Sequence, residues 1–375
     1  MRLIVAGGGT GGHLFPGIAV AEEFLARDPE NQVLFVGARQ GIEARVLPER
    51  GLPHRLLDVS GLKGLGLGAR LRGLMRLPVA LLRALGIVRE FRPDIVLGVG
   101  GYASGPVLLG AWLARAYTAV QEQNSRAGLT NRVLGRLVRR VFLGFEGARS
   151  QFPAAKTAVT GNPVRSDIRA KAAQPSPLPA QPHVVILGGS QGARALNERL
   201  PEVWKKVAPQ HPGLKWTHQC GRGNLDGVKA AYGTGAEGIT VAEFVSDMAA
   251  LIQDATLVVG RAGASTVAEL AALGRPALFV PFPAATDDHQ TLNARDCVAA
   301  GGAVLVPQAE AAVERLAAEV DRLLRSRTEL ERMGLAMRSF GKPDAAARIV
   351  DICLADLGRS AGAGGKGMAA GGRAA

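Results

Sequence analysis

A histidine directly after a glycine-rich turn is the first group in this chain that could do acid–base chemistry. Residues 3–6 predict a buried strand, glycines follow in the turn Gly7–Gly12, and residues 16–26 have the apolar spacing of a helix. Such glycines let phosphate oxygens approach N–H groups at a helix N-terminus. His13 would lie at the crevice by the strand ends, where an imidazole can act as general base toward a hydroxyl group. The alternative is that His13 only caps the helix or binds backbone.

The same turn formally matches the fingerprint of dinucleotide-binding proteins. The next expected strand, residues 33–36, ends at Gly37-Ala38-Arg39 without the carboxylate that holds a ribose 2′-hydroxyl. Arg39 could favour a 2′-phosphate instead. An NAD(P)-dependent oxidoreductase therefore stays open as an alternative, although the glycine motif alone is weak support for it.

A second candidate phosphate site lies at residues 260–269, between an expected strand and a short helix. The N–H groups of Ala264, Ser265 and Thr266 would attract a diphosphate at the helix N-terminus. Glu269 has two interpretations. The spacing alone favours the far half of a Thr266-x-x-Glu269 capping box, and the other interpretation is an acceptor for ribose hydroxyl groups.

A polar cluster follows at residues 287–293, after an expected strand and a proline-rich loop. The amides of Gln290 and Asn293 suit sugar hydroxyl groups because each offers a donor and an acceptor. The aspartates and the histidine of the cluster could ligate a metal, but ligands that are adjacent in sequence rarely make a site. The chain also has no Asp-x-Asp motif, so no metal is expected.

Strand–glycine–helix units position these groups. They begin at residue 3 and again at residue 184, which predicts two Rossmann-like halves. Between the halves, residues 171–182 carry a proline at every second or third position, which excludes regular structure and predicts a linker. Residues 358–375 are rich in glycine and alanine and are expected to be a disordered tail.

Length and charge narrow the class of protein. The chain has 375 residues, enough for two domains, and a net charge of +13, which implies a polyanionic neighbour such as nucleic acid, an anionic membrane or a phosphorylated substrate. Aromatic residues make up only 5%, too few for stacking on single strands, so a nucleic-acid-binding module rests on charge alone. Three widely spaced cysteines indicate a reducing cytosol, and no signal peptide or membrane span is expected.

The basic, amphipathic stretch at residues 69–92 has two interpretations. It could dock on an anionic membrane, or it could be a helical hairpin packed on the core with solvated arginines. Pro78 argues against one uninterrupted helix. The apolar face carries Leu71, Leu74, Met75, Leu82 and Leu85, and Arg72 and Arg76 lie off it.

Together the motifs resemble the MurG family, bacterial transferases that move N-acetylglucosamine from UDP onto lipid I to make lipid II. The match runs from about residue 1 to residue 357. This chain departs from the family at Gln121, where histidine is frequent, at His289, and in the slightly longer loop 283–286. The matching motifs are GGGTGGHLFPGIAVA from Gly7, SGLKG from Ser60, GVGGYASGP from Gly98, EQNSRAGLTN from Glu122, GNPVR from Gly161, GGSQGARALN from Gly188, EFVSDM from Glu243, RAGASTVAEL from Arg261 and DDHQTLNA from Asp287.

The resemblance implies a GT-B fold, in which two doubly wound, Rossmann-like α/β domains face each other across a cleft. Residues 1–160 would form the acceptor and membrane-docking domain, joined by a final helix near 344–357. Residues 161–343 would bind the UDP-sugar. The family implies no role for the tail after residue 357.

The resemblance also implies roles for single residues. His13 would be the catalytic base, with Glu122 as the second candidate. In the nucleotide half, Glu269 would hold the ribose, Val245 would lie at the uracil and Arg165 would reach the nucleotide from the domain junction. Ser190, Ala264, Ser265 and Thr266 would bind the diphosphate, and Gln290, Asn124, Thr10, Gly11 and Gly12 would handle the sugar.

The implied reaction is an inverting transfer to the muramoyl C4 hydroxyl in peptidoglycan synthesis, which serves cell shape and division. Helix N-termini at Ser190 and Ala264 would stabilise the leaving diphosphate, so no cofactor or metal is expected. Expected partners are UDP-N-acetylglucosamine, lipid I, an anionic membrane surface and other cell-wall synthesis proteins, but no nucleic acid. The expected location is the cytoplasmic face of the cell inner membrane, as a peripheral protein. A GT-B enzyme with another UDP-sugar or glycolipid, or a UDP-sugar epimerase, remains an alternative.

Overall fold

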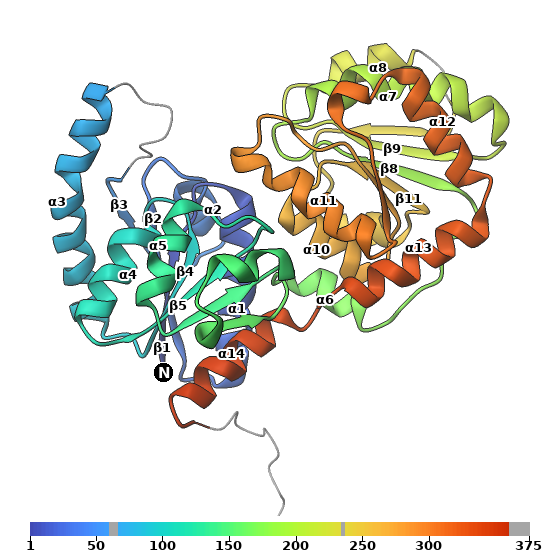
Figure 1. Ribbon diagram of the computed structural model, residues 1–375. Helices are drawn as coiled ribbons and strands as arrows, with labels where there is room; N and C mark the ends of the chain where they lie inside the picture. Colours follow the sequence, from blue (N-terminus) through green and yellow to red (C-terminus); the bar gives the residue numbers. More distant parts are fainter. Residues whose placement is uncertain (60–66, 234–236, 360–375) are drawn as a thin grey trace, which may run out of the picture.

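The computed structural model of the protein describes residues 1–59, 67–233 and 237–359, with the backbone alone for residues 67–77. It contains two α/β domains, and each is built on one parallel sheet with helices on both faces (Figure 1). This is the doubly wound, two-domain architecture that the sequence predicts.

The first domain is built on a seven-stranded sheet. In sheet order its strands are β3 (His54–Leu57), β2 (Gln32–Ala38), β1 (Arg2–Gly7), β4 (Ile95–Gly100), β5 (Tyr117–Glu122), β6 (Arg140–Leu143) and β7 (Thr157–Val159). Its helices are α1 (Gly11–Arg27), α2 (Glu43–Glu49), α3 (Leu67–Phe91), α4 (Ser104–Leu113), α5 (Leu129–Leu137), α14 (Ala345–Asp356) and the short 3₁₀ turns η1 (Glu146–Gln151) and η2 (Ala154–Lys156).

The second domain is built on a six-stranded sheet. In sheet order its strands are β10 (Ile239–Ala242), β9 (Lys215–Gln219), β8 (His183–Leu187), β11 (Leu257–Gly260), β12 (Ala277–Phe279) and β13 (Ala303–Leu305). In both sheets the order reverses beside the first strand, and doubly wound sheets bind ligands at such a point. The helices are α6 (Ser166–Ala172), α7 (Arg194–Val207), α8 (Leu225–Tyr232), α9 (Met248–Gln253), α10 (Ala264–Leu273), α11 (His289–Ala299), α12 (Val313–Leu324), α13 (Arg327–Phe340) and the 3₁₀ turns η3 (Ala208–Gln210), η4 (Thr286–Asp288) and η5 (Gln308–Glu310).

The central strands are apolar along their whole length because helices cover both faces of each sheet. In β1, Leu3 and Val5 pack with α1 and α14, whereas Ile4 and Ala6 pack with α3, α4 and α5. The second sheet is divided in the same way, with α7, α8 and α12 on one face and α6, α9, α10 and α11 on the other. Side chains that alternate along one strand therefore belong to two separate cores.

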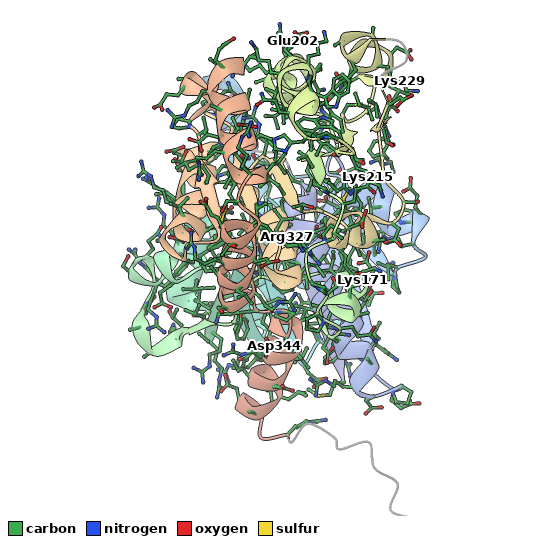
Figure 2. The ribbon with its side chains drawn as sticks, turned by 90° about the vertical axis from the view of Figure 1, so that its right-hand side faces the viewer. Lys171, Glu202, Lys215, Lys229, Arg327 and Asp344 are labelled. Atoms are coloured by element: carbon green, nitrogen blue, oxygen red, sulfur yellow. The ribbon has the colours of Figure 1, made fainter. Side chains whose placement is uncertain are left out.

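The chain passes between the domains twice. It leaves the first domain after β7, through residues 160–165, and it returns between α13 and α14 (Figure 1). Ile349 and Leu354 of α14 lie in the core of the first domain, so this helix belongs to that domain. Figure 2 shows the side of the molecule on which Lys171, in α6, and Asp344, just before α14, lie.

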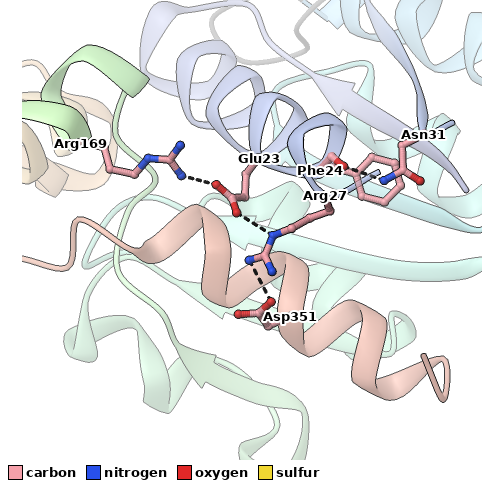
Figure 3. A network of polar contacts seen from close by, with 6 residues as sticks. All are labelled: Glu23, Phe24, Arg27, Asn31, Arg169 and Asp351. Atoms are coloured by element: carbon pink, nitrogen blue, oxygen red, sulfur yellow. Dashed lines mark hydrogen bonds and ion pairs between the residues drawn. The ribbon is translucent and has the colours of Figure 1, made fainter. Parts of the chain in front are cut away.

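One polar network ties both passages to α1 (Figure 3). Glu23 of α1 accepts hydrogen bonds from Arg169 of α6 and, at 2.8 Å, from Arg27. Arg27 also pairs with Asp351 of α14 at 3.0 Å. Burial alone would raise the pKa of Glu23, but the two guanidinium groups outweigh it and hold the pKa below its ordinary value. The ionised carboxylate therefore joins the two segments that connect the domains.

The proline-rich stretch 171–182, which the sequence predicts to be a linker without regular structure, is packed on the second domain. It has no helix or strand after Ala172, as the prolines require. However, the buried Arg275 donates hydrogen bonds to the carbonyl oxygens of Ser176 and Pro177, both at 3.2 Å. Arg327 donates to the Leu178 carbonyl at 2.7 Å. Two arginines of the second domain thus satisfy carbonyl groups that no regular structure pairs.

Helix α3 runs without interruption from Leu67 to Phe91, so the break expected at Pro78 is wrong. Pro78 and Val79 are exposed, and a carbonyl group that loses its partner there can bind water. Within the ranges that the structure describes, no helix combines the length and apolar character of a membrane span. Of the expected docking side chains, Leu82 is 69% exposed and Leu85 is half-buried, and those of Leu71, Arg72, Leu74, Met75 and Arg76 lie outside the described residues.

Candidate active site

The glycine turn after β1 is held by a buried carboxylate that the sequence pattern did not reveal. Glu43 of α2 is fully buried and accepts hydrogen bonds from the N–H groups of Gly9 at 2.6 Å and Ala38 at 2.7 Å. Gly8 has a φ of +140°, and a Cβ there would lie 2.5 Å from this carboxylate, so the position requires glycine. The Gly9 N–H is already hydrogen-bonded to Glu43. An anion at this turn would therefore have to be bound by the N–H groups in the first turn of α1.

Thr10, Gly11 and Gly12 form the accessible start of α1. Thr10 and Gly12 are exposed, and Gly11 is half-buried. Thr10 occupies the N-cap position, but its side chain makes no capping hydrogen bond. The N–H groups of a helix start without such a cap are available to a ligand. The predicted contact of these residues with a substrate stays a prediction.

His13 lies in the first turn of α1, half-buried, where three neighbouring strands end. Its Nδ1 lies 2.8 Å from Oε1 of Gln123, a buried residue directly after β5. The ring packs over Gly100, at the end of β4, where a Cβ would approach the imidazole to 3.1 Å. His13 is thus at the carboxyl edge of the sheet, the position that the sequence predicts for it. Its role as a base stays a prediction.

Glu122, the second candidate base, is 1% exposed, and both of its carboxylate oxygens are occupied. Oε1 accepts the N–H of Asn124 at 3.0 Å. Oε2 accepts the N–H of Gly128 at 3.1 Å and the side-chain amide of Asn131 at 2.9 Å. A carboxylate engaged in this way shapes the loop between β5 and α5 rather than reaching for a substrate hydroxyl group. The geometry therefore favours His13 as the base.

The loop after β5 contacts the second domain through α11. Asn293 is fully buried, and its Oδ1 accepts the N–H of Ser125 at 2.9 Å while its amide donates to Asn124 at 3.2 Å. The Ser125 hydroxyl donates to Asp296 at 2.5 Å. Asn124, predicted to handle the sugar, therefore lies at the contact between the domains. The same helix, α11, carries Gln290.

Glu269 does not cap a helix. Helix α10 begins at Ala264 after Gly263, so Thr266 is already inside the helix and the expected capping box is wrong. Instead, Glu269 accepts a hydrogen bond at 3.0 Å from Nε of Arg165. Burial raises the pKa of Glu269, and the positive charge of Arg165 opposes that shift. The structure thus pairs two residues that were predicted separately to hold the nucleotide.

The first turn of α10 has the features of an anion site. Its N-cap is Gly263, which has no side chain to satisfy the first N–H groups of the helix. Ala264 is buried, and Ser265 and Thr266 are half-buried. The Ser265 hydroxyl is buried and has no hydrogen-bond partner among the described residues. An unpaired buried hydroxyl costs about 1–3 kcal/mol, which a ligand oxygen would recover.

Ser190 lies exposed in the turn after β8, but not at a helix N-terminus. Helix α7 begins at Arg194, so the prediction that a helix starts at Ser190 is wrong. The turn is held by Gln219, whose Oε1 accepts the Gly189 N–H at 2.9 Å. Its amide donates to the carbonyl oxygens of Gly189 at 3.1 Å and Glu243 at 2.7 Å. Gln219 has no motif that could have revealed this role.

Two further predicted residues lie on loops beside these turns. Gln290 is half-buried at the start of α11, and its Oε1 accepts the Phe282 N–H at 3.0 Å. Val245 is half-buried between β10 and α9. Arg261, which no sequence argument singled out, donates to the Val280 carbonyl at 2.8 Å and so shapes the loop that carries Phe282. Its place in the RAGAST motif was the available signal.

The arrangement can bind anions at two helix starts, one in each domain, with an imidazole at the start of α1. Among the residues that the structure describes, no group of three histidine, cysteine, aspartate or glutamate side chains is placed to hold a metal ion. The polar groups are hydrogen-bond donors and acceptors suited to phosphate and sugar.

Comparison with protein families identifies both halves of the chain. Residues 3–143 match the glycosyltransferase family 28 N-terminal domain, and residues 183–349 match the glycosyltransferase family 28 C-terminal domain. These two matches cover both sheets described above apart from β7, and they agree with a GT-B fold. They define the class of protein as a glycosyltransferase of two domains.

Individual relatives narrow this class. A protein of Anaeromyxobacter sp. (strain Fw109-5), named UDP-N-acetylglucosamine–N-acetylmuramyl-(pentapeptide) pyrophosphoryl-undecaprenol N-acetylglucosamine transferase, is 48% identical over 94% of this chain and 93% of its own length. A Myxococcus xanthus protein of the same name is 43% identical over 94% of this chain and 92% of its own. The crystal structure of Acinetobacter baumannii MurG is similar with a TM-score of 0.76, 33% identity and coverage of 94% and 99%. The chain belongs to the MurG family.

Proposed function

We propose that the protein transfers N-acetylglucosamine from UDP-N-acetylglucosamine to the C4 hydroxyl group of N-acetylmuramic acid in undecaprenyl-diphosphate-linked muramoyl-pentapeptide, with inversion at the anomeric carbon. The observation that carries this proposal is the 48% identity to a transferase of that name over 94% of the chain. The product, lipid II, is a precursor of peptidoglycan, so the reaction serves cell-wall growth, cell shape and division.

His13 is the proposed base. The acceptor is a sugar hydroxyl group that is a weak nucleophile at neutral pH, so its proton must leave as the new bond forms. No described residue bonds to Nε2 of His13, whereas Nδ1 is engaged by Gln123. Nε2 is therefore the nitrogen that is available to a hydroxyl group. Asn124 and the start of α1 would orient the sugar beside it.

The start of α10 is the proposed site of the leaving diphosphate. As the bond to the anomeric carbon breaks, negative charge grows on UDP, and N–H groups at a helix N-terminus stabilise that charge. The buried Ser265 hydroxyl can donate one more hydrogen bond. Glu269 would accept hydrogen bonds from the ribose, once its pairing with Arg165 adjusts. This donor set can act without a metal ion, and we propose that the reaction is metal-independent.

One face of the first domain is the proposed membrane contact, and we call it the docking surface. Helices α3, α4 and α5 cover the same face of the sheet (Figure 1). Each of these helices exposes large apolar side chains. Arg132 and Arg136 of α5 are also exposed. Apolar area with neighbouring cations suits an anionic lipid surface. The apolar residues of the docking surface are Val79, Leu82, Trp112, Leu113, Leu129, Val133 and Leu137.

The cytoplasmic face of the inner membrane is the proposed location. The net charge of +13 favours an anionic leaflet. Cys220, Cys297 and Cys353 are free and buried, as expected in a reducing compartment. A lipid-linked acceptor would bring the protein to the membrane during each turnover, and other cell-wall synthesis proteins are the proposed neighbours there.

The test of the reaction uses purified protein, UDP-N-acetylglucosamine and a lipid I analogue in detergent, with a chelator present. We expect the disaccharide lipid, identified by mass spectrometry, and little product with other UDP-sugars. No product from a folded protein that still binds UDP would contradict the assigned acceptor.

The test of the base is His13→Ala, which should lower the rate of the chemical step by about 10²–10⁴ without loss of folding. The matched control is His54→Ala, because His54 lies in β3 and its imidazole contacts the Leu52 carbonyl oxygen. A loss below tenfold in the folded His13 variant would move the base to another residue.

A further inference from the structure

A chain of buried side-chain amides runs from His13 to the segment that connects the domains. Gln123 is 1% exposed, Gln121 is fully buried and Asn162 is 4% exposed. Gln123 contacts His13 at 2.8 Å, Gln121 donates to Asn162 at 2.8 Å, and the two glutamines are hydrogen-bonded to each other. None of these amides was singled out as a candidate site residue.

The direction of the hydrogen bonds in this chain is fixed at Gln123. A backbone carbonyl oxygen can only accept, and the Val99 carbonyl lies 2.8 Å from the Gln123 side-chain nitrogen. That contact places the nitrogen of the Gln123 amide toward Val99 and its oxygen toward His13. Turning the amide over would set two oxygens against each other at Val99. The assignment therefore rests on the chemistry of the partners.

The fixed amide decides which nitrogen of His13 carries the proton. The oxygen of Gln123 can only accept, so Nδ1 of His13 must donate to it. In a neutral imidazole only one nitrogen carries hydrogen, and Nε2 is then an unprotonated acceptor. Gly100 packs against the same ring, where even a Cβ would come within 3.1 Å. The ring is thus held in its tautomer by Gln123 and in its plane by the end of β4.

We propose that Gln123 is a positioning residue of the transfer reaction, and that its side-chain oxygen holds His13 in the Nδ1–H tautomer so that Nε2 can take the proton of the acceptor hydroxyl. This inference rests on the function proposed above. Gln121 supports the same arrangement, because its oxygen accepts from Gln123 and its amide donates onward to Asn162. Here an amide does the orienting that a carboxylate does in other histidine bases, and it adds no charge beside the ring.

The first test needs no substrate. Nitrogen-15 labelling of the six histidines followed by NMR at a pH where imidazole is neutral reports the tautomer of each ring, and loss of one signal in His13→Gln assigns His13. We expect the Nδ1–H tautomer in the wild type and its loss in Gln123→Met. The control is Gln151→Met, because Gln151 hydrogen-bonds to Ala127 and Ser125 of the same loop rather than to His13. An Nε2–H tautomer in the wild type would overturn the proposal even if the Gln123 variant does not fold.

The second test separates positioning from general loop structure. Gln123→Met should lower kcat about ten- to a hundredfold, because misplaced reacting groups lose rate of that order, while the KM for UDP-N-acetylglucosamine changes less than about threefold. In a His13→Ala background the same change should cost almost nothing further. Full additivity of the two losses, or unchanged kcat in Gln123→Met, would overturn the proposal. An Nδ1–H tautomer in a protein without transferase activity would instead remove the proposed function and leave the tautomer assignment intact.

Discussion

Replacing Asp356 by asparagine should loosen α14 from the first domain and lower the melting temperature of the protein. Asp356 stands at the end of the last helix, 15% exposed at its side chain, and contacts two residues of the sheet. Its Oδ2 accepts from the Tyr117 hydroxyl at 2.8 Å and from Nε of Arg140 at 2.6 Å. Its Oδ1 accepts from the second nitrogen of Arg140 at 2.8 Å. Asparagine keeps one acceptor and turns an N–H group toward a donor.

The size of the effect follows from these contacts. Hydrogen bonds to charged groups contribute about 1.5–3 kcal/mol, and the substitution removes the charge together with one acceptor. For a domain of this size, 1 kcal/mol corresponds to roughly 2–4 °C, so the melting temperature should fall by about 3–12 °C. Asp351→Asn is the matched control, because Asp351 lies on the same helix, is 48% exposed and pairs with Arg27. Exposed pairs contribute little, and its effect should stay below about 2 °C.

The difference in melting temperature between the wild type and Asp356→Asn should also depend on pH. The Arg140 guanidinium holds the pKa of Asp356 below its ordinary value of 3.8. A carboxyl group whose pKa is lowered by folding stabilises the protein fully above its unfolded pKa, and this contribution is lost as the pH falls through the folded value. Calorimetry should therefore show the same difference between wild type and Asp356→Asn from pH 8 to pH 5, and a smaller one only below about pH 4. Equal melting temperatures for the Asp356 and Asp351 variants would refute the reasoning and assign the docking of α14 to its apolar side chains alone.

Three further outcomes are expected. Glu269→Gln should raise the KM for the UDP-sugar about ten- to a hundredfold with little change in kcat, because it weakens charged hydrogen bonds to the ribose. Glu198→Gln is the control, because Glu198 is exposed on α7. Unchanged affinity of the Glu269 variant for UDP, measured by calorimetry, would contradict this prediction. Val133→Asp should reduce co-sedimentation with anionic vesicles, because it puts a charge into the docking surface. Val298→Asp, on α11, should leave co-sedimentation unchanged. Equal vesicle binding by the two variants would show that the membrane contact lies outside the docking surface. Excess EDTA should leave turnover unchanged, and a magnesium-dependent loss beyond tenfold would disprove metal independence.

The strands and their glycine turns were predictable because their signals are local. A run such as residues 3–6 is apolar in every position only when both faces of a strand are covered, and the structure shows that cover. The position of His13 at the end of that strand followed directly. The order of motifs along the chain, and not any single one, pointed to two domains and to the MurG family.

The residues that hold the site in shape were not predictable from local pattern. Glu43 meets the glycine turn across 34 positions of sequence, Gln123 meets His13 across 110, and Gln219 meets Gly189 across 30. Each is an ordinary polar residue until the fold brings it to its partner. Hydrophobic periodicity and motif spacing cannot show such contacts, because both depend only on residues that are close together in the sequence.

The wrong predictions have specific physical causes. The prediction of a capping box at Glu269 is wrong because the N-cap of α10 is Gly263, three residues before Thr266. Glycine is itself an acceptable N-cap residue. The helix expected at Ser190 begins later because Gly192, with a φ of +76°, is not in helical conformation. Pro78 failed to break α3 because it lies on the exposed side of the helix.

The return of the last helix has a consequence for synthesis of the protein on the ribosome. Tyr117 and Asp356 are separated by 239 positions, and residues of α14 complete the core around β1 that α1 and α2 cover in part. At about 5–20 residues per second, the first domain would wait roughly 10–50 s after Tyr117 is made before its final helix appears. During that time part of its apolar face is open to wrong contacts. Chaperone capture of nascent chains should therefore persist until α14 has been translated and has left the ribosome, even though the second domain is already complete.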